Sequence, residues 1–421
     1  MMNPLSVESY LEKILAPISP SKVVTVPLLE AVGMVAAEDM AAKLSVPPFT
    51  NSAMDGFAFN SADLSAELPF TLQVVGEVAA GSGEALRCEA GQAIRIMTGA
   101  PLPAGANTVV PVELTDQEPG PADLPQAVQV RESVKPGANV RQAGENVQPG
   151  DIVVKRGDVL SPAALSALAS VGFGQVPVYS RPRVAVISTG DELVPAGVEP
   201  GAGQIPDSNS VLLSSLLSQQ GYEVQVTPIA SDSPEQLLAA LQDLANEVDL
   251  IISTGGVSAG VYDVVKAATS QLGVDFTKVA MQPGKPQGFG MVNAAGKQIP
   301  FVALPGNPVS VFVSFHLFVT PVLATLQGRS GDALTWLEAK QISARIVHEV
   351  KSPKGRRQFF PVRFLRDEDG LCCERTHALG SGSHLVATLA QAQGLAIIPA
   401  ETLQLPADTE LPVIDLRLPW F

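Results

Sequence analysis

The spacing of apolar and polar residues changes along the chain and divides it into regions of different secondary structure. Residues 6–15 place apolar side chains at helical spacing, with Ser6 at the start and Pro17 just beyond the end. This pattern predicts a first helix capped by Ser6. Residues 25–46 begin with a strand-like piece, Thr25–Leu28, and continue with helical spacing. The opening part of the chain is therefore predicted to mix short helices with a strand.

Residues 70–146 read as an all-β region, because short runs of strand-forming residues are separated by glycine, proline and asparagine. The acidic, proline-rich run from Asp116 to Pro125 is interpreted as a hairpin excursion. A short helix is predicted at Pro162–Val171, with Ser161 as its cap and Gly172 at its end. The predicted strands are Thr71–Val75, Gln92–Met97, Thr108–Val112 and Ala127–Val130.

From Arg183 onward, strands and helices alternate, which predicts parallel βαβ units with helices on both faces of one sheet. The predicted strands are Val184–Ile187, Glu223–Ala230, Asp249–Ser253 and Phe301–Leu304, and the predicted helices are Asn209–Gln220, Glu235–Ala245, Asp263–Leu272 and Pro308–Leu326. After Gly328 the pattern returns to β, which predicts a small C-terminal β domain. Its predicted strands are Leu337–Val347, Phe359–Leu365, Leu371–Glu374, Gly394–Ile398 and Leu411–Arg417.

The stretch 298–328 has no charged residue, a composition that a membrane span also has. Pro305, Gly306 and Pro308 divide it, so we interpret it as a strand, a turn and one helix buried in a large core. The first 17 residues lack the apolar segment of a signal peptide. These features predict a cytoplasmic protein that does not span a membrane.

Composition narrows the class of ligand. Only 16% of residues are charged, and the net charge is −15. Such an acidic chain is a poor non-specific binder of nucleic acids or anionic membranes, so any bound phosphate needs a local cation or a metal ion. Cys88, Cys372 and Cys373 provide no disulfide framework and are predicted to be reduced thiols.

Candidate chemistry follows the strands of the α/β region, where open sheets bind their ligands. Four loops rich in small residues begin there, and such loops expose backbone N–H groups that bind phosphate or another oxyanion. A single loop of this kind could be an ordinary βα turn, whereas four at one edge predict an oxyanion site. They are Ser188–Glu192, Ser231–Pro234, Ser253–Gly260 with Asp263 beyond it, and Pro305–Pro308.

Three of these loops also carry carboxylates, Glu192, Asp232 and Asp263. Carboxylates beside a phosphate site indicate an intervening Mg²⁺, which prefers oxygen ligands. The alternative is that they cap helices, and for Asp232 the two interpretations are equally good. Cationic charge comes from Lys278 and Lys285 around a Pro-Gly turn, although surface lysines are more often simply solvated.

Several motifs together resemble the MoeA and gephyrin E-domain family of molybdopterin molybdenumtransferases. The resemblance covers nearly the whole chain, in order and at compatible spacing. The motifs are Asn51-Ser52-Ala53-Met54-Asp55-Gly56-Phe57, Ile94-Arg95-Ile96-Met97-Thr98-Gly99-Ala100, Ser188-Thr189-Gly190-Asp191-Glu192-Leu193, Gly255-Gly256-Val257-Ser258, Pro283-Gly284-Lys285-Pro286 and Leu304-Pro305-Gly306-Asn307-Pro308-Val309-Ser310.

The resemblance implies the fold class α/β plus β, in a multidomain chain with a molybdopterin-binding-type α/β domain, a β-rich inserted domain and a small C-terminal β-barrel-like domain. The implied parts are an N-terminal helix that packs on the α/β domain (1–26), a linking α+β domain (27–46 and 147–181), the inserted domain (47–146), the α/β domain (182–328) and the C-terminal β domain (329–421).

The resemblance also implies the reaction. Molybdate is inserted into the dithiolene of adenylylated molybdopterin, AMP is released, and Mg²⁺ is required. The implied assembly is a homodimer. The implied partners are the molybdopterin adenylyltransferase of the same pathway and the chaperones of molybdoenzymes, with no nucleic acid and no membrane.

Site residues carry over motif by motif. The implied catalytic residues are Asp55, Glu192, Asp232, Asp263, Lys278 and Lys285, and the implied metal ligands are Glu192, Asp232 and Asp263. The implied substrate-binding residues are Thr98, Ser188, Thr189, Gly190, Ser253, Gly255, Gly256, Ser258, Pro305, Gly306, Asn307, Pro308, Arg356 and Ser383. Asp55 is implied to enter the cleft across the dimer.

Two positions depart from the usual family pattern. Asn146 stands where relatives often have Asp, and Gln282 stands where they often have Lys. The first change removes a carboxylate and the second an ammonium group. Two other functions therefore stay open, a non-catalytic scaffold that retains the molybdopterin-binding fold and the preceding adenylyltransferase step. The intact acids and Lys285 favour the enzyme that inserts molybdate.

Overall fold

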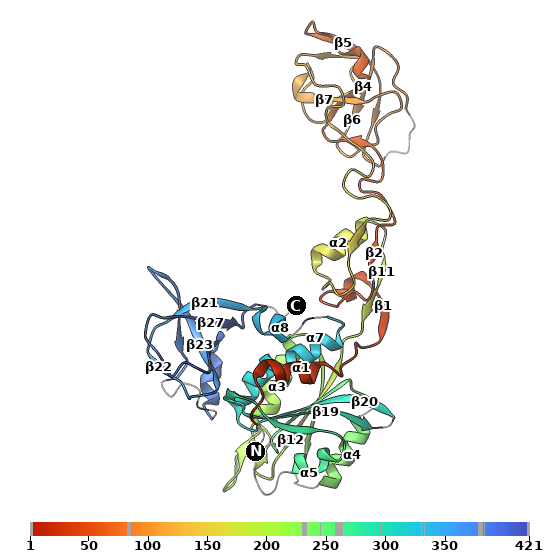
Figure 1. The fold of residues 1–421 in the computed structure, drawn as a ribbon. Helices are drawn as coiled ribbons and strands as arrows, with labels where there is room; N and C mark the ends of the chain where they lie inside the picture. The colour runs from red at the N-terminus through yellow and green to blue at the C-terminus, as the bar shows by residue number, and fades with distance from the viewer. Residues whose placement is uncertain are drawn as a thin grey trace.

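The computed structural model of the chain has an elongated body-and-arm shape (Figure 1). We call residues 23–179 the arm and the remainder the body. The structure describes all residues except 1–2, 82–85, 230–233, 245, 257–263, 295, 330, 332, 378–381, 383 and 419–421. All three cysteines lie in the described part and are buried thiols outside any disulfide.

The centre of the body is a six-stranded sheet in the order β15-β12-β16-β20-β19-β17. The first four strands are parallel, as predicted, whereas β19 is antiparallel to both of its neighbours, β20 and β17. β19 and β20 form a hairpin that was not predicted, because Gly288 and Gly290 in β19 resemble loop residues. They are needed because neighbouring chain lies within 3 Å of where a Cβ would stand. The strands are β12 (Arg183–Thr189), β15 (Glu223–Ile229), β16 (Leu250–Thr254), β17 (Asp275–Lys278), β19 (Pro286–Ala294) and β20 (Lys297–Leu304).

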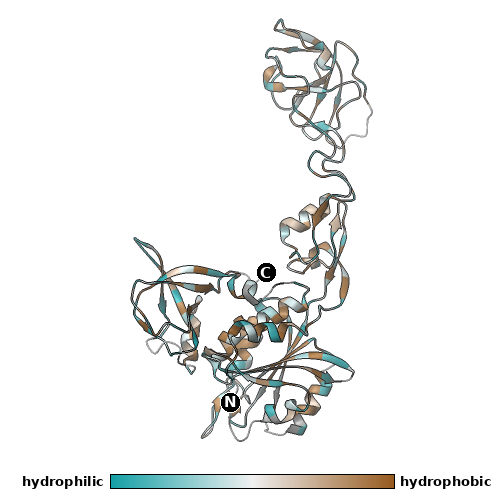
Figure 2. Ribbon diagram, viewed as in Figure 1, coloured by the Kyte–Doolittle hydropathy of each residue, from teal (hydrophilic) through white to brown (hydrophobic). Residues whose placement is uncertain are grey.

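Helices cover both faces of this sheet. Alternating strand residues divide between two hydrophobic clusters, so that Val186 packs toward α1 and α3 while Ile187 packs toward α4 and α5. Ser6 caps α1 as predicted, accepting a hydrogen bond from the backbone N–H of Ser9 at 3.0 Å. In Figure 2 apolar colour is densest on the helices at the centre of the body, whereas α4 and α5 also carry hydrophilic colour. These helices are α1 (Val7–Leu15), α3 (Ser208–Gln219), α4 (Pro234–Leu244) and α5 (Val264–Ser270).

The uncharged stretch ends in a core helix of three parts, α6 (Pro308–Ser314), η4 (Phe315–Val319) and α7 (Thr320–Leu326). The middle part is a π-helix, in which the N–H of Thr320 bonds to the carbonyl of Phe315. Pro321 explains the wider turn, because its ring lacks an N–H and would clash with a carbonyl in a regular helix. This is the one helix within the described residues that is long and apolar enough to span a membrane, and its apolar window is 94% buried in the protein.

The base of the arm is a small unit with its own hydrophobic cluster. The predicted helix within residues 25–46 is wrong: the chain forms only a short 3₁₀ turn, because Pro27 and Gly33 interrupt it on either side. The elements are β1 (Val23–Pro27) paired with β11 (Gln175–Tyr179), β2 (Met40–Ala41) paired with β10 (Ile152–Val154), η1 (Leu28–Ala31) and α2 (Pro162–Ser170).

The tip of the arm is a five-stranded sheet in the order β7-β4-β6-β5-β8, with Phe57, Phe59 and Ile94 in its core. The predicted hairpin from Asp116 to Pro125 is wrong, since its three prolines cannot donate to a strand ladder and it forms a loop without strands. The elements are β3 (Asn51–Ser52) paired with β9 (Val140–Arg141), β4 (Gly56–Phe59), η2 (Ser61–Asp63), β5 (Phe70–Val78), β6 (Gln92–Ile96), β7 (Thr108–Pro111), η3 (Val112–Leu114) and β8 (Ala127–Val130).

The C-terminal part of the body is a closed barrel of five strands, because β23 pairs with both β24 and β25. The expected multidomain fold class is confirmed. The predicted strand from Leu337 is wrong at its start, where residues 333–338 form a helix. The elements of this part are α8 (Ala333–Glu338), β21 (Gln341–Ile346), β22 (Val350–Lys351) paired with β26 (Gln404–Leu405), β23 (Arg357–Asp367), β24 (Gly370–Arg375), η5 (Val386–Gln391), β25 (Gly394–Ile398) and β27 (Glu410–Asp415). Three short strands belong to the α/β region: β13 (Leu193–Val194) pairs with β14 (Ile205–Pro206), and β18 (Met281–Gln282) pairs with β23.

Candidate active site

The carboxyl ends of β12, β16 and β20 bring three of the predicted loops together at one edge of the sheet. A Cβ at Gly255 would lie 2.7 Å from the carbonyl oxygen of Thr189, and φ at this glycine is +88°. A side chain is therefore excluded on both steric and conformational grounds. Gly306, in the loop Pro305–Pro308 that follows β20, lies next to Gly255, since a Cβ on it would be 3.5 Å from the Gly255 Cα. The three loops therefore meet at one place at this edge of the sheet.

Two side chains that the sequence analysis did not select hold these loops in place. Asp207 accepts a 2.6 Å hydrogen bond from the Ser188 hydroxyl and also caps α3 through the N–H of Ser210. Asn209 donates to the carbonyl of Gly306 at 2.7 Å. The signal was available, since Asp-Ser-Asn immediately precedes an apolar helical pattern, the signature of a helix start. Asp207 and Asn209 therefore connect the start of α3 to two of the loops.

The predicted substrate-binding residues in these loops differ in exposure. Gly306 and Asn307 are exposed, Gly255, Gly256 and Pro308 are half-buried, and Ser188, Thr189, Gly190, Ser253 and Pro305 are buried. Ser253 is fully buried, and within the described part of the chain its hydroxyl has no hydrogen-bond partner. Gly306 and Asn307 therefore present the most accessible surface of the group to a ligand.

Glu192 is the predicted metal ligand that the structure describes. Its carboxylate is exposed and folds back over Gly190, where a Cβ would lie 2.5 Å from Oε2. The described residues contain no cluster of three or more metal-binding side chains. The other two predicted ligands, Asp232 and Asp263, lie outside the described residues, as do Ser258 and Ser383. An exposed carboxylate beside phosphate-type loops suits a hard cation such as Mg²⁺.

A cavity of about 530 Å³ adjoins the loop Pro305–Pro308, and cationic groups from two domains line it. Lys285 comes from the α/β domain, and Arg356 comes from the barrel. His384 lies on the barrel side as well. The cavity is lined by Met281, Gln282, Pro283, Gly284, Lys285, Pro286, Pro305, Gly306, Asn307, Ser310, Arg356, Gly382 and His384. The described residues of the lining include no carboxylate, so this part of the cavity suits an anion despite the acidic chain.

A rigid turn presents Lys285 to this cavity. Gly284 has φ +95°, and a Cβ there would lie 3.1 Å from the hydroxyl of Ser314. The buried amide of Gln287 donates to the Gly284 carbonyl and to the Ser314 hydroxyl, both at 2.7 Å. The carbonyl of Lys285 accepts from the N–H of Val279 at 2.8 Å. These contacts fix the backbone, so the ammonium group projects from a defined point.

The departure at Gln282 lies at the same cavity. Its side-chain oxygen accepts a 3.4 Å hydrogen bond from Arg356. The neutral amide therefore orients the guanidinium where a lysine would add a charge. Lys278 is exposed at the end of β17 and pairs through its backbone with Pro286, and it does not line the cavity. The structure thus brings Lys285 and Arg356 to the same cavity, whereas Lys278 lies outside it, on the strand that pairs with Pro286.

Asp55 and Thr98 form a pair at the tip of the arm. Asp55 Oδ1 accepts hydrogen bonds from the Thr98 backbone N–H at 2.6 Å and from its hydroxyl at 2.8 Å. These bonds, that from the backbone first, hold the pKa of the Asp55 carboxyl below its ordinary value. The pair lies far from the sheet loops of the same chain (Figure 1). The sequence analysis named Asp55 as catalytic and Thr98 as substrate-binding from two separate motifs; the structure brings them together, and one chain does not bring them to the other site residues.

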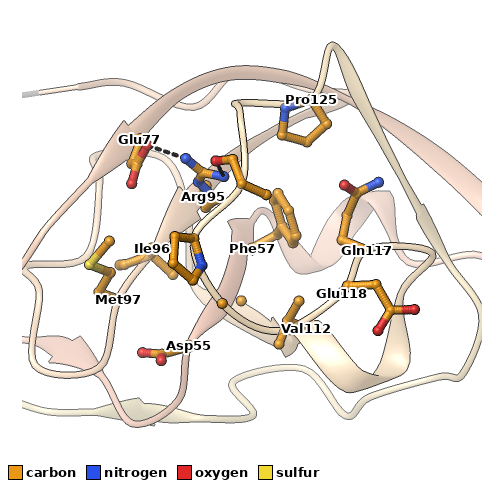
Figure 3. A pocket seen from close by; sticks show the side chains of 14 residues that line it. Asp55, Phe57, Glu77, Arg95, Ile96, Met97, Val112, Gln117, Glu118 and Pro125 are labelled. Carbon is orange, nitrogen blue, oxygen red and sulfur yellow. Dashed lines mark hydrogen bonds and ion pairs between the residues drawn. The ribbon is translucent and has the colours of Figure 1, made fainter.

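A second cavity, of about 430 Å³, opens beside Asp55. Figure 3 shows Phe57, Ile96 and Val112 among its apolar walls. Arg95 fastens one wall, since its guanidinium contacts Glu77 at 2.5 Å and the carbonyl of Ala122 at 2.8 Å. The hydrogen bond from Arg95 in β6 therefore holds the proline-rich loop, residues 116–125, at the side of this cavity.

Comparison with known proteins gives matches along the chain. Residues 5–172 match the MoeA N-terminal region (domain I and II), residues 185–325 match a probable molybdopterin binding domain, and residues 343–416 match the MoeA C-terminal region (domain IV). Together the three regions cover the arm, the α/β domain and the barrel.

Relatives extend over most of the chain. Molybdopterin molybdenumtransferase 2 of Mycobacterium tuberculosis is 41% identical over 410 residues, covering 93% of this chain and 95% of that protein. A molybdopterin molybdenumtransferase of Haemophilus influenzae is 36% identical, covering 89% of each. Two crystal structures of a molybdopterin biosynthesis MoeA protein from Pyrococcus horikoshii superpose with TM-scores of 0.79 and 0.78, at 31% and 28% identity and over 98% of this chain and 99% of theirs.

Proposed function

This chain belongs to the MoeA family of molybdopterin molybdenumtransferases, and from that premise we propose that it inserts molybdate into adenylylated molybdopterin with release of AMP. The observation that carries the proposal is the cationic cavity between the α/β domain and the barrel. The cavity adjoins the loop after β20, one of the three loops predicted to bind phosphate. An oxyanion in the cavity and a phosphate-bearing ligand on the loops would therefore lie side by side.

The cavity residues suit molybdate, a tetrahedral dianion. Lys285 supplies a compact ammonium group, and Arg356 supplies a planar guanidinium that can contact two oxygens at once. Ser310 adds a polar side chain at the start of α6. Lys285 and Arg356, with no carboxylate among the described residues that line the cavity, favour an anion over cationic ligands.

The loops after β12, β16 and β20 suit the phosphate groups of adenylylated molybdopterin. Loops rich in small residues at the carboxyl ends of parallel strands bind oxyanions through backbone N–H groups, and Gly306 and Asn307 are the exposed residues that a ligand would reach first. The ties from Asp207 and Asn209 hold this surface in one arrangement. Binding both substrates at adjoining sites reduces the entropic cost of bringing them together.

We assign the magnesium ligands to Glu192, Asp232 and Asp263. The exposed carboxylate of Glu192, beside these loops, supports the assignment. When bound, Mg²⁺ would offset the negative charge of the phosphate groups. The carboxylates of this chain would hold that ion next to the loops and thereby let an anionic substrate bind to an acidic protein.

Asp55 requires a second chain. Because Asp55 lies at the tip of the arm, we propose a homodimer in which the arm of one chain completes the site in the body of the other. Five large apolar residues at the base of the arm support an assembly, as they are 43–88% exposed in the single chain: Val23, Leu29, Val32, Leu44 and Ile152. The lowered pKa keeps Asp55 ionised, and Thr98 fixes its orientation.

The test is incubation of the protein with adenylylated molybdopterin, Mg²⁺ and molybdate, with AMP release as the measured quantity. We expect AMP release that depends on molybdate, and reactions without molybdate or without protein serve as controls. Binding of adenylylated molybdopterin without AMP release would contradict the proposal and favour the non-catalytic scaffold.

A further inference from the structure

The root of the arm lacks a shared hydrophobic core with the body. The base of the arm has one hydrophobic cluster, and the sheet of the body has two others, with no residue in common. A cavity of about 630 Å³ lies at the junction, lined by Val32 and Gly33 of the arm, by Gly221 of the body and by Arg181 in the connection between them. Packing of apolar side chains alone therefore does not determine the orientation of the arm relative to the body.

Arg181 makes two polar contacts at this junction. Its Nη2 donates to the carbonyl of Val32 in the arm at 2.5 Å, and its Nη1 lies 3.5 Å from the carbonyl of Gly221 in the body. The planar guanidinium can hold two acceptors at a fixed angle, which a lysine ammonium cannot do. One side chain thus connects the arm to the end of α3.

Two glycines in left-handed turns lie beside the guanidinium. Gly33 has φ +72° and Gly221 has φ +80°, a conformation that other residues rarely adopt. A Cβ at Gly221 would lie 3.2 Å from Nη1 of Arg181, and a Cβ at Gly33 would lie 3.9 Å from Nη2. The carbonyls of Val32 and Gly221, at these turns, both lie next to the guanidinium of Arg181.

A second contact lies nearby. The ring of Tyr179, at the end of β11, lies against Gly328 so closely that a Cβ there would be 2.2 Å from it. The Tyr179 hydroxyl accepts a 3.0 Å hydrogen bond from Arg156 in the arm. Among the described residues the ring has no directional bond to the body. The connection is anchored by Ser21, whose backbone N–H donates to the carbonyl of Leu326 and whose hydroxyl donates to the carbonyl of Ser180, both at 2.6 Å. Arg181 is the side chain that contacts both the arm itself and the end of α3.

We propose that Arg181 is a positioning residue, which directs the arm so that Asp55 reaches the site in the partner chain. The inference rests on the proposed homodimer with sites completed across it. A long arm amplifies a small rotation at its root into a large displacement at its tip. Loss of the two contacts would misplace Asp55 while leaving the body of the same chain intact.

The test uses heterodimers made by co-expressing two variants with different affinity tags and purifying through both. The reference heterodimer combines Asp55→Asn with Lys285→Ala. It has one complete site, formed by the arm of the Lys285→Ala chain and the body of the Asp55→Asn chain, and is expected to release AMP. If it does not, sites across the dimer are disproved, and the proposed role of Arg181 falls with them.

Arg181→Ala is then paired with each variant in turn. With Lys285→Ala, the body of the Arg181→Ala chain receives an unaltered arm, so activity is expected to equal that of the reference. With Asp55→Asn, the only intact Asp55 lies on the misdirected arm, so activity is expected to fall by about tenfold, the rate equivalent of one charge-assisted hydrogen bond.

Two results overturn the proposal while the reference heterodimer is active. Equal activity of both Arg181→Ala pairings would show that the arm does not need this residue. Loss in the pairing with Lys285→Ala would show that Arg181 supports its own body. Arg181→Lys, which keeps the charge, is the milder variant if Arg181→Ala fails to fold, and it is expected to show the same asymmetry to a smaller extent.

A distance measurement follows the arm directly. Spin labels at Glu67→Cys in the arm tip and Glu247→Cys in the body are expected to give a broader distance distribution with Arg181→Ala than without it. Arg183→Ala is the matched control, because its exposed side chain makes no hydrogen bond or ion pair among the described residues. An unchanged distribution with Arg181→Ala would contradict the proposal.

Discussion

At the scale of single residues, Lys285 is the cation on which the proposed molybdate site depends. We expect Lys285→Ala to lower AMP release by roughly 10- to 150-fold, the rate equivalent of a charge-assisted contact of about 1.5–3 kcal/mol. The thermal midpoint should hardly change, because the backbone of the turn is held by Gln287. Lys351→Ala is the control, since it removes the same charge from an exposed strand of the barrel. An unchanged rate with Lys285→Ala would exclude a role for this lysine.

Asp55 provides a second test at this scale. Hydrogen bonds from Thr98 lower its pKa, so its share of stability is present above the unfolded value of about 3.9 and is lost as pH falls through the folded value. Carbon-detected NMR titration should give a folded pKa below about 3.9. Thr98→Val should raise it only partly, because the backbone N–H still donates. An ordinary Asp55 pKa in the unmodified protein would contradict the observed contacts.

At the scale of elements, the turn between β18 and β19 determines where Lys285 points. Gly284→Ala places a side chain at φ +95° and within 3.1 Å of Ser314. The left-handed conformation costs about 1–2 kcal/mol, so we expect a lower thermal midpoint and weaker molybdate binding by calorimetry. Gly174→Ala is the control, as this glycine has open space and an ordinary φ. Equal effects of the two changes would show that the turn tolerates a side chain.

At the scale of the whole molecule, the proposed dimer would bury the apolar surface at the base of the arm. Light scattering should give about twice the 43.8 kDa of one chain. Leu29 is 88% exposed in the single chain, and Leu29→Glu should shift the protein toward monomers. Leu403→Glu, on the barrel, is the control because Leu403 is also exposed. A single-chain mass for the unmodified protein at micromolar concentration would disprove the dimer.

The sequence by itself determined the local features of this protein. Ser6 marks the start of α1, and the alternation from Arg183 onward predicts the four parallel strands and the edge where their loops meet. Pattern and spacing suffice for these, because capping, periodicity and the chemistry of parallel sheets act over short stretches of chain. The motifs around Asp55 and Lys285 also identify the family without a structure.

Only the tertiary structure decided features that depend on distant parts of the chain. The hairpin of β19 and β20 needed close contacts at Gly288 and Gly290, which the sequence presents as loop glycines. The cationic cavity pairs Lys285 with Arg356 of another domain, and the loops are held by Asp207 and Asn209 from the start of α3. Arg181 contacts Val32 of the arm and Gly221 at the end of α3, which lie far from each other in the chain. These arrangements come from contacts between residues far apart in the chain, and no local pattern encodes them.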